Sequence, residues 1–220
     1  MDDATNNNWI AGRIPRNYNR AMHPWRDRLD RWLSPMARRT RLSPNAISVI
    51  ALVLNVIAAA CLYERWFLIA ILFIAAGGLA DALDGIVARV HGTASRFGDF
   101  LDHCFDRVSD TLVAAGWLMG NAVRAPIVVA AIIVVMMNGY VGTQIEATYR
   151  ERNYDAIGRG EFVLALIVFP IVSSILFDNG WDTWRFAALT IAEWLALLLI
   201  VFALLGIVQR FALARRLDRA

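Results

Sequence analysis

Six apolar stretches, each close to the length of a bilayer-spanning helix, dominate this chain of 220 residues. A helix rises about 1.5 Å per residue, so about 20 apolar residues are needed to cross roughly 30 Å of hydrocarbon. Short connections that carry Gly, Asn, Asp or Arg separate the stretches. The sequence therefore predicts an all-α integral membrane protein with six transmembrane helices, at residues 46–63, 66–83, 102–120, 125–145, 162–177 and 185–208.

Composition excludes most other classes of protein. Hydrophobic residues make up 58% of the chain and charged residues only 19%, whereas a soluble domain has about 25% charged residues. The same figures exclude a disordered chain and a coiled coil. The two cysteines, Cys61 and Cys104, lie in apolar or helical surroundings, so no disulfide framework is expected. No nucleic-acid partner is expected either.

Arginine supplies all 22 basic residues, and its distribution predicts an orientation. Nineteen arginines fall on one side of the predicted helices, and only Arg65, Arg124 and Arg185 fall on the other. Positively charged loops stay on the cytoplasmic side. Both termini are therefore expected in the cytoplasm of a bacterial or archaeal cell. An aromatic belt on the outer side is expected from Trp66, Trp117, Trp181 and Trp184.

Residues 1–44 are expected to form a cytoplasmic segment in front of a six-helix transmembrane domain, residues 45–220. Apolar side chains recur in this segment at helical spacing, with charged residues between them. The pattern predicts an interfacial amphipathic helix, and a solvated basic tail is the alternative. Pro35 and Pro44 are expected to bracket the turn into the bilayer. The recurring apolar residues are Trp25, Leu29, Trp32, Leu33 and Met36.

Carboxylates interrupt the second and third stretches at their inner ends, where ionisable residues are costly and mark functional sites. Asp81 and Asp84 end the second stretch, and Asp102 and Asp106 begin the third. Each pair projects from one face of its helix, and the short connection between the helices brings the pairs together. Such a cluster requires cations, and oxygen ligands suit two Mg²⁺ or Mn²⁺ ions. Alternatively, arginines neutralise the aspartates as structural ion pairs, namely Arg89, Arg96 and Arg107.

Eight residues of this region follow the pattern D-x2-D-G-x2-A-R-x8-G-x3-D-x3-D. They are Asp81, Asp84, Gly85, Ala88, Arg89, Gly98, Asp102 and Asp106. The pattern resembles the signature of the CDP-alcohol phosphotransferase (CDP-alcohol phosphatidyltransferase) family. The resemblance implies a membrane-embedded six-helix catalytic domain, which usually pairs as a homodimer. It also implies transfer of a substituted phosphate from a CDP-linked lipid donor such as CDP-diacylglycerol to a polar alcohol acceptor, with release of CMP, in phospholipid biosynthesis.

The resemblance also implies a role for each motif residue. Asp81, Asp84 and Asp102 would be metal ligands, with Asp106 near the metals and acting as the general base. Nucleotide or pyrophosphate binding would involve Gly85, Ala88, Arg89 and Gly98, with Asn45 at the start of the first span. Small motif residues also permit close helix packing, and Asn45 or Ser43 also suits a helix cap, so these roles have structural alternatives.

The acceptor alcohol stays open at this point. Residues 139–146 resemble the S-Y-x-R-A-R-A-E segment of family members that use inositol phosphate, but Gly142 and Gln144 stand where the arginines belong. The loss of two phosphate-binding groups argues against a phosphorylated polyol. Other candidates for acceptor binding are Asp99, Arg150, Arg152 and Arg159.

Two other classes of membrane protein compete with this interpretation. An intramembrane Mg²⁺-dependent prenyltransferase also holds a diphosphate with aspartates, but it has more spans and two separated aspartate motifs. A cation carrier has an ion path of aspartates that continues across the membrane. Here both aspartate pairs fall within 26 residues, and the outer halves of the helices carry only scattered polar groups such as Asn55 and Glu193.

Overall fold

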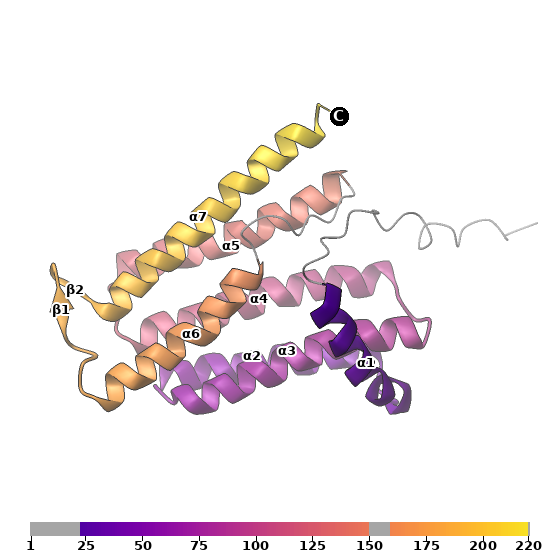
Figure 1. Cartoon of the computed structure of the whole chain (residues 1–220), viewed down its shortest axis with the longest axis horizontal. Coiled ribbons are helices and arrows are strands. Elements are labelled where there is room, and N and C mark those ends of the chain that lie inside the picture. The colour runs from indigo at the N-terminus through magenta and orange to yellow at the C-terminus, as the bar shows by residue number, and fades with distance from the viewer. Residues whose placement is uncertain (1–22, 150–158, 220) are drawn as a thin grey trace, which may run out of the picture.

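The computed structural model describes residues 23–149 and 159–219, with side chains over 28–149 and 165–219. This part of the chain is helical except for one short antiparallel hairpin (Figure 1). In chain order the elements are α1 (His23–Arg39), α2 (Pro44–Tyr63), α3 (Phe67–Val90), α4 (Arg96–Gly120), α5 (Ala125–Tyr149), α6 (Arg159–Asp178), β1 (Arg185–Phe186), β2 (Leu189–Thr190) and α7 (Ile191–Leu217).

Four helices, α2, α3, α5 and α7, are long and apolar enough to cross a membrane. Only 28–39% of the residues in their apolar windows are buried inside the protein, so most of these side chains face outward. Leu68 and Leu72 of α3, for example, are 69% and 70% exposed. An outer surface of this kind is stable in lipid rather than in water. The chain is therefore an all-α membrane protein.

The other two predicted spans coincide with α4 and α6, which do not qualify over their described residues. Helix α4 carries aspartates and arginines along its first half. In α6 the apolar segment with described side chains is only Ala165–Asp178. A count of six spans therefore stays a prediction.

Helix α2 packs against both α3 and α4, and α5 packs against α7. Two glycines of α4 lie directly on the backbone of α2. A Cβ atom at Gly116 or at Gly120 would lie only 2.9 Å from the Cα atom of Ala59 or Tyr63, respectively. Small residues allow such close approach of membrane helices. The contact brings the first half of α4 beside the N-terminal end of α2 and the C-terminal end of α3.

Trp117 of α4 lies in the core and not in an outer aromatic belt, which corrects the sequence prediction. Its side chain is 1% exposed, and its Nε1 donates a hydrogen bond of 2.9 Å to Ser173 Oγ on α6. A buried indole N–H requires such a partner, and the pairing joins two helices. The remaining belt residues, Trp66, Trp181 and Trp184, are 58–59% exposed.

Helix α7 begins at Ile191, so the prediction of a sixth span starting at residue 185 is wrong at that end. Residues 185–190 form the β1–β2 hairpin, whose turn places Ala187 and Ala188 at positive φ angles of 47° and 66°. A capping box then starts the helix. Thr190 Oγ1 accepts a hydrogen bond from Glu193 N at 3.2 Å, and Thr190 N donates to Glu193 Oε2 at 2.9 Å.

The N-terminal segment contains a helix, α1, whose interfacial position stays a prediction, and its apolar residues do not share one surface. Leu33 and Ala37 are buried against α3, whereas Trp32 and Met36 are 68% and 54% exposed. The helix therefore docks on the bundle through one face and leaves a second apolar face open. The side chain of Trp25 lies outside the described residues.

The turn that precedes α2 lies between Pro35 and Pro44, but Pro35 is not next to it. Pro35 lies inside α1, which continues to Arg39. Next to it, Ser34 Oγ donates a hydrogen bond of 2.5 Å to the carbonyl oxygen of Asp30. Pro44, in contrast, starts α2 as expected, at a position where a missing backbone N–H costs nothing.

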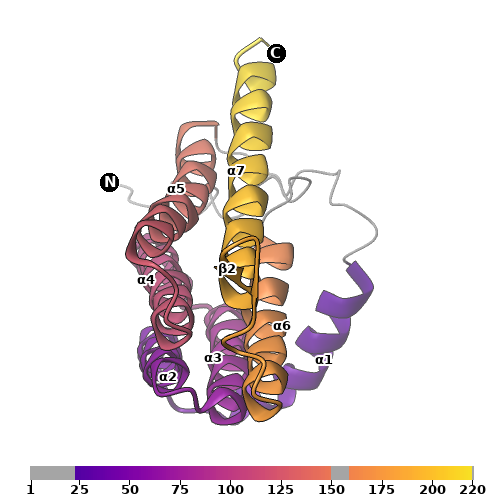
Figure 2. The ribbon, with the colours of Figure 1, turned by 90° about the vertical axis from the view of Figure 1, so that its left-hand side faces the viewer.

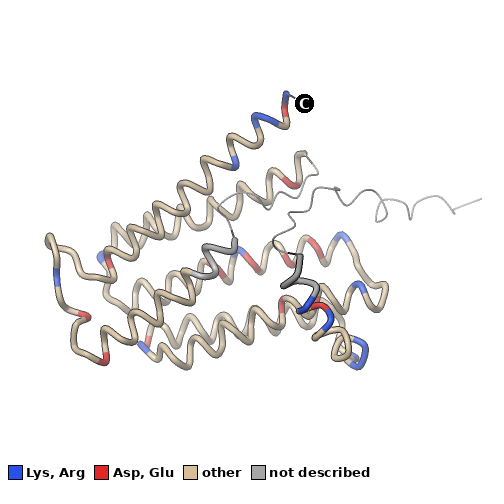
Figure 3. Tube along the Cα trace, viewed as in Figure 1, with Lys and Arg blue, Asp and Glu red and all other residues tan. Residues whose placement is uncertain are grey.

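Charged residues collect mainly at one end of the bundle. Helix α1, the α3–α4 connection and the C-terminal end of α7 lie at this end, and the β1–β2 hairpin lies at the opposite end (Figure 1). Seen from the hairpin end, α1 stands to one side of the other helices (Figure 2). Acidic and basic positions of α3 and α4 meet beside α1 (Figure 3). A functional site is therefore expected at this end of the bundle.

Candidate active site and metal centre

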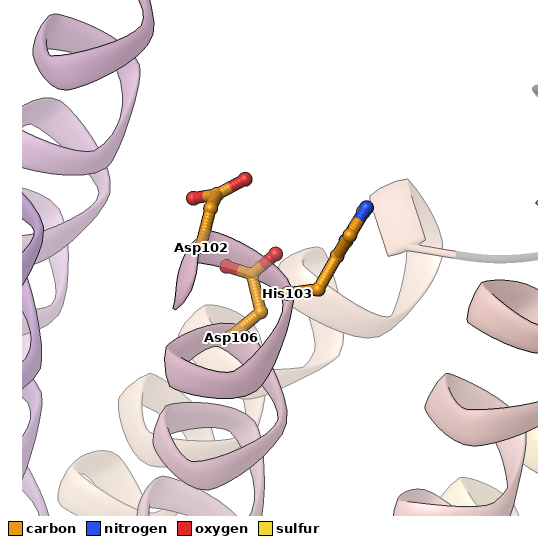
Figure 4. A group of neighbouring side chains, drawn as sticks. All are labelled: Asp102, His103 and Asp106. Carbon is orange, nitrogen blue, oxygen red and sulfur yellow. The ribbon is translucent and has the colours of Figure 1, made fainter. Parts of the chain in front are cut away.

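The four motif aspartates come together from α3 and α4. One carboxylate oxygen from each of Asp81, Asp84 and Asp102 lies within 4.8 Å of the others. A second set of atoms has the same spread and contains an oxygen of Asp102, an oxygen of Asp106 and a ring nitrogen of His103. Figure 4 shows these last three side chains on two successive turns of α4. Asp102 belongs to both sets.

Local structure explains this convergence. Helix α3 continues to Val90 instead of ending near residue 83, so both of its aspartates are held in regular helix. Helix α4 begins at Arg96, because Ser95 Oγ accepts a hydrogen bond of 3.0 Å from Gly98 N and caps the helix. The connection therefore covers only residues 91–95, and the two pairs lie at similar depth.

The oxygen atoms of this cluster fit divalent cations. Asp84 and Asp106 are only 7% and 6% exposed, and buried carboxylates require compensation of their charge. Carboxylate oxygen is the donor that Mg²⁺ and Mn²⁺ prefer. Of the arginines considered as neutralising partners, Arg89 pairs with Asp30 of α1, and Arg107 Nη2 lies 3.8 Å from Asp106 Oδ2.

Ser48 of α2 supports the cluster and was missed by the sequence analysis. Its buried hydroxyl donates a hydrogen bond of 2.5 Å to Asp84 Oδ2. Such a bond fixes the direction of the carboxylate. A signal was available, because Ser48 follows Asn45 by three residues, and residues at this spacing share a helix face.

The predicted nucleotide-binding residues lie beside the aspartates. A Cβ atom on Gly85 would have only Arg89 Nη1 near it, at 3.5 Å. Close helix packing therefore does not explain this glycine, and the backbone is open on that side. Ala88 is half-buried and Arg89 is exposed.

Asn45 reaches the same end from the first turn of α2. Its Oδ1 lies 3.4 Å from the position of a Cβ atom on Gly98. Ser43 caps α2 instead of Asn45, because Ser43 Oγ accepts a hydrogen bond of 3.3 Å from Ala46 N. The amide of Asn45 is therefore not needed as a helix cap.

Helix α1 contributes Asp30, a second residue that sequence reasoning missed. The carboxylate oxygens of Asp30 lie 3.3 and 3.4 Å from Arg89 Nη2. The side chain of Asp30 is 41% exposed and that of Arg89 is 52% exposed. No pattern within α1 distinguishes Asp30 from a solvated charge, since only the fold brings it to the motif arginine.

Two arginines lie over the face of α5 that contains Gly139 and Gly142, the second of which is one of the two departures from the inositol-phosphate segment. Arg210 of α7 donates hydrogen bonds from Nη1 to the backbone and side-chain oxygens of Asn138. Its Cζ is 3.3 Å from where a Cβ atom of Gly142 would lie. The guanidinium group of Arg107 lies directly on Gly139, where a side chain would clash with it.

Sequence reasoning counted Arg210 only among the nineteen arginines of the cytoplasmic side. Nothing singled it out, because Arg210 lies two residues beyond the predicted sixth span, which ended at residue 208. In the structure the last helix, α7, continues to Leu217 and so includes Arg210.

The other candidates for acceptor binding are only partly described. Asp99 Oδ2 lies 3.9 Å from His103 Nε2, so Asp99 faces the rim of the second ligand set. Arg150 and Arg152 lie outside the described residues, as does the side chain of Arg159.

Comparison with known proteins identifies the class. Residues 41–205 match the CDP-alcohol phosphatidyltransferase family, so the chain belongs to this family. It is therefore a metal-dependent transferase of phospholipid biosynthesis, which moves a substituted phosphate from a CDP-linked donor to a polar alcohol. This result decides against the prenyltransferase and the cation carrier.

Individual relatives are 28–29% identical to this chain over the aligned residues. Archaetidylinositol phosphate synthase of Pyrococcus horikoshii is 29% identical over 137 residues, which cover 61% of this chain and 72% of the relative. Phosphatidylinositol phosphate synthase of Mycobacterium bovis is 28% identical over 196 residues, with 80% and 82% covered.

Two solved structures of Mycobacterium tuberculosis phosphatidylinositol phosphate synthase have the same fold. The structure with CDP-DAG bound has a TM-score of 0.65 and 27% identity, and covers 84% of this chain and 94% of its own. The complex with manganese and citrate has a TM-score of 0.66 and 25% identity, with 83% and 88% covered.

Proposed function

We propose that this enzyme transfers a phosphatidyl-type group from a CDP-linked lipid, such as CDP-diacylglycerol, to a phosphorylated polyol. The observation that carries the proposal is the pair of ligand sets that share Asp102. Residues of the family motif surround this aspartate. The mycobacterial relative with bound CDP-DAG supports a lipid donor of this kind.

The metal centre would hold two ions, either Mg²⁺ or Mn²⁺. Asp81, Asp84 and Asp102 would bind one ion, and Asp102 and Asp106 would bind the other. Divalent ions neutralise charge on a pyrophosphate and on the departing phosphate, which lowers the barrier to phosphoryl transfer. Ser48 would keep the carboxylate of Asp84 in its binding orientation.

The donor would bind between the inner ends of α2, α3 and α4. Arg89 offers a planar guanidinium group that matches phosphate oxygens. Gly85 and Ala88 leave space for the nucleotide to approach the backbone of α3. Asn45, beside Gly98, offers an amide to the cytidine side of the donor.

Asp106 would act as the general base. Its carboxylate takes the proton of the acceptor hydroxyl while the hydroxyl oxygen attacks the phosphorus atom of the lipid phosphate. The bond between this phosphorus and the CMP oxygen breaks, and CMP leaves with the electron pair. The buried position of Asp106 limits competition from water.

The acceptor would carry a phosphate group of its own. Arg107 and Arg210 approach one face of α5 at Gly139 and Gly142, three residues apart. Two guanidinium groups at this spacing favour a multiply charged anion. The relatives named for inositol-phosphate products make inositol phosphate the first acceptor to test.

Further acceptor contacts would come from the rim of the site. Asp99 would accept hydrogen bonds from polyol hydroxyls. Three arginines would add positive charge around the phosphate, namely Arg150, Arg152 and Arg159.

The site and both termini would face the cytoplasm, since nineteen of the 22 arginines fall on one side of the predicted spans in the sequence. Helices α4 and α6 would complete six spans around the buried aspartates. The exposed side chains of Trp32 and Met36 would place α1 in the membrane interface. Pairing as a homodimer is part of the same proposal.

The test is release of CMP by the purified protein in lipid vesicles that contain CDP-diacylglycerol and Mg²⁺ or Mn²⁺. The acceptors to compare are inositol phosphate, inositol, glycerol phosphate and serine. We expect release with inositol phosphate and little with inositol or serine. A preference for an unphosphorylated alcohol would contradict the proposed role of the arginines.

The Asp106→Asn variant tests the general base. We expect turnover to fall by about 10²–10⁴-fold, because the amide cannot accept the proton. Asp178→Asn is the matched control at the opposite end of the bundle and should keep normal turnover. Near-normal activity of Asp106→Asn, with an unchanged melting temperature, would remove Asp106 from this role.

A further inference from the structure

His103 adds a nitrogen atom to two sets of possible metal ligands that otherwise contain only carboxylate oxygens. It is one of three histidines in the chain and follows Asp102 directly. Its side chain is 24% exposed. In Figure 4 the imidazole rises from the same turn of α4 as Asp102, and Asp106 rises from the next turn, with its carboxylate drawn between Asp102 and His103.

The spread of the second ligand set is close to what one ion requires. Ligands bound at about 2.1 Å to a six-coordinate ion lie about 3 Å apart when adjacent and about 4.2 Å apart when opposite. The chosen atoms of Asp102, His103 and Asp106 all lie within 4.8 Å of one another. Small side-chain rotations therefore suffice to bring the three onto one ion.

Two further carboxylates lie near the imidazole of His103. Nε2 lies 3.8 Å from Glu146 Oε2 on α5 and 3.9 Å from Asp99 Oδ2 on α4. These distances exceed those of direct hydrogen bonds, so these two contacts do not hold the ring rigidly. Carboxylates behind metal-binding histidines commonly fix the ring and strengthen it as a ligand.

We propose that His103 is a nitrogen ligand of the second metal position, which consequently prefers Mn²⁺ to Mg²⁺. The proposal rests on the metal centre of the proposed function and identifies one of its ligands. Mg²⁺ binds hard oxygen donors and rarely exchanges its water for imidazole. Imidazole favours transition metals, so a single histidine shifts the selectivity of an aspartate site toward Mn²⁺.

Pulsed electron paramagnetic resonance of Mn²⁺ bound to the purified full-length protein tests the proposal without measurement of turnover. A directly bound imidazole nitrogen produces a hyperfine coupling that changes when histidine is labelled with ¹⁵N. This comparison requires no mutation. We expect the coupling in the wild-type protein and in His91→Ala, whose histidine is exposed in the α3–α4 connection, but not in His103→Ala.

Competition between Mn²⁺ and Mg²⁺ provides a second measurement. The affinity ratio for the two ions should fall by about tenfold or more in His103→Ala and stay unchanged in His91→Ala.

The outcomes separate the two proposals. If the wild-type protein binds no Mn²⁺ at all, the metal centre of the proposed function fails, and this inference fails with it. If Mn²⁺ binds with no nitrogen coupling, or if the coupling survives in His103→Ala, the carboxylate centre stands and the role of His103 is refuted.

Discussion

Removal of the Ser48 hydroxyl tests whether the hydrogen bond that α2 donates to the carboxylate of Asp84 matters for the metal centre. In Ser48→Ala, Asp84 Oδ2 loses the hydrogen bond of 2.5 Å that it accepts inside the protein. A hydrogen bond to a charged group contributes about 1.5–3 kcal/mol. Because about 1.4 kcal/mol corresponds to a factor of ten, the metal affinity should fall by roughly tenfold to a hundredfold. Loss of other groups that support metal ligands has effects of about this size.

The assay is the dependence of CMP release on metal concentration, together with calorimetric titration of Mn²⁺. The half-saturating metal concentration should rise by the predicted factor, while the maximal rate at saturating metal falls less. Ser174→Ala is the matched control, since Ser174 is also a buried helical serine beside an aspartate, at 3.5 Å, but at the opposite end of the bundle. Equal metal dependence of Ser48→Ala and the wild-type enzyme would refute the reasoning.

Three further predictions concern packing and charge. Gly116→Ala should lower the melting temperature by forcing α2 and α4 apart, at a cost of about 1–3 kcal/mol. Gly78→Ala, where a Cβ meets nothing within 4 Å, should be neutral or stabilising, and equal effects would contradict the packing argument. Arg124→Ala should cost about 2 kcal/mol in a melting experiment, because it removes the 2.6 Å salt bridge of the buried Glu193, while Glu193→Gln costs less; the reverse order would refute this. Asp30→Asn should leave stability within about 1 kcal/mol, since its salt bridge to the motif arginine is exposed, and should lower the KM for the CDP-linked donor by at most about fivefold. An increase in this KM would indicate that Asp30 positions the arginine for the donor.

The helices were predictable in their approximate position because the bilayer imposes one length and one polarity on them. Their ends were less predictable, because local hydrogen bonds decide them. The start of α7 depends on the capping box between Thr190 and Glu193, and residues before it form a hairpin despite their apolar character. The end of α3 was placed too early because carboxylates near Leu83 resemble the end of a span.

The aspartate motif was predictable for the reason that makes it functional. Carboxylates at membrane depth are costly, so they stand out from an apolar sequence. Ser48 and Arg210 do not stand out in this way. Their partners lie 36 and 72 residues away in the chain, and each acquires meaning only when the fold brings the partner close. Periodicity within one helix does not identify a partner on another helix.

The comparison of residues 139–146 with the inositol-phosphate segment was misleading because it considered α5 alone. Gly142 removes a positive charge from α5, which argued against a phosphorylated acceptor. In the structure, however, Arg210 of α7 lies 3.3 Å from the place of the missing Cβ. A side chain at position 142 would therefore require this guanidinium group to shift by a few tenths of an ångström. The side chain missing from α5 therefore leaves room for a charged group from α7, and the charge of this surface depends on the two helices together.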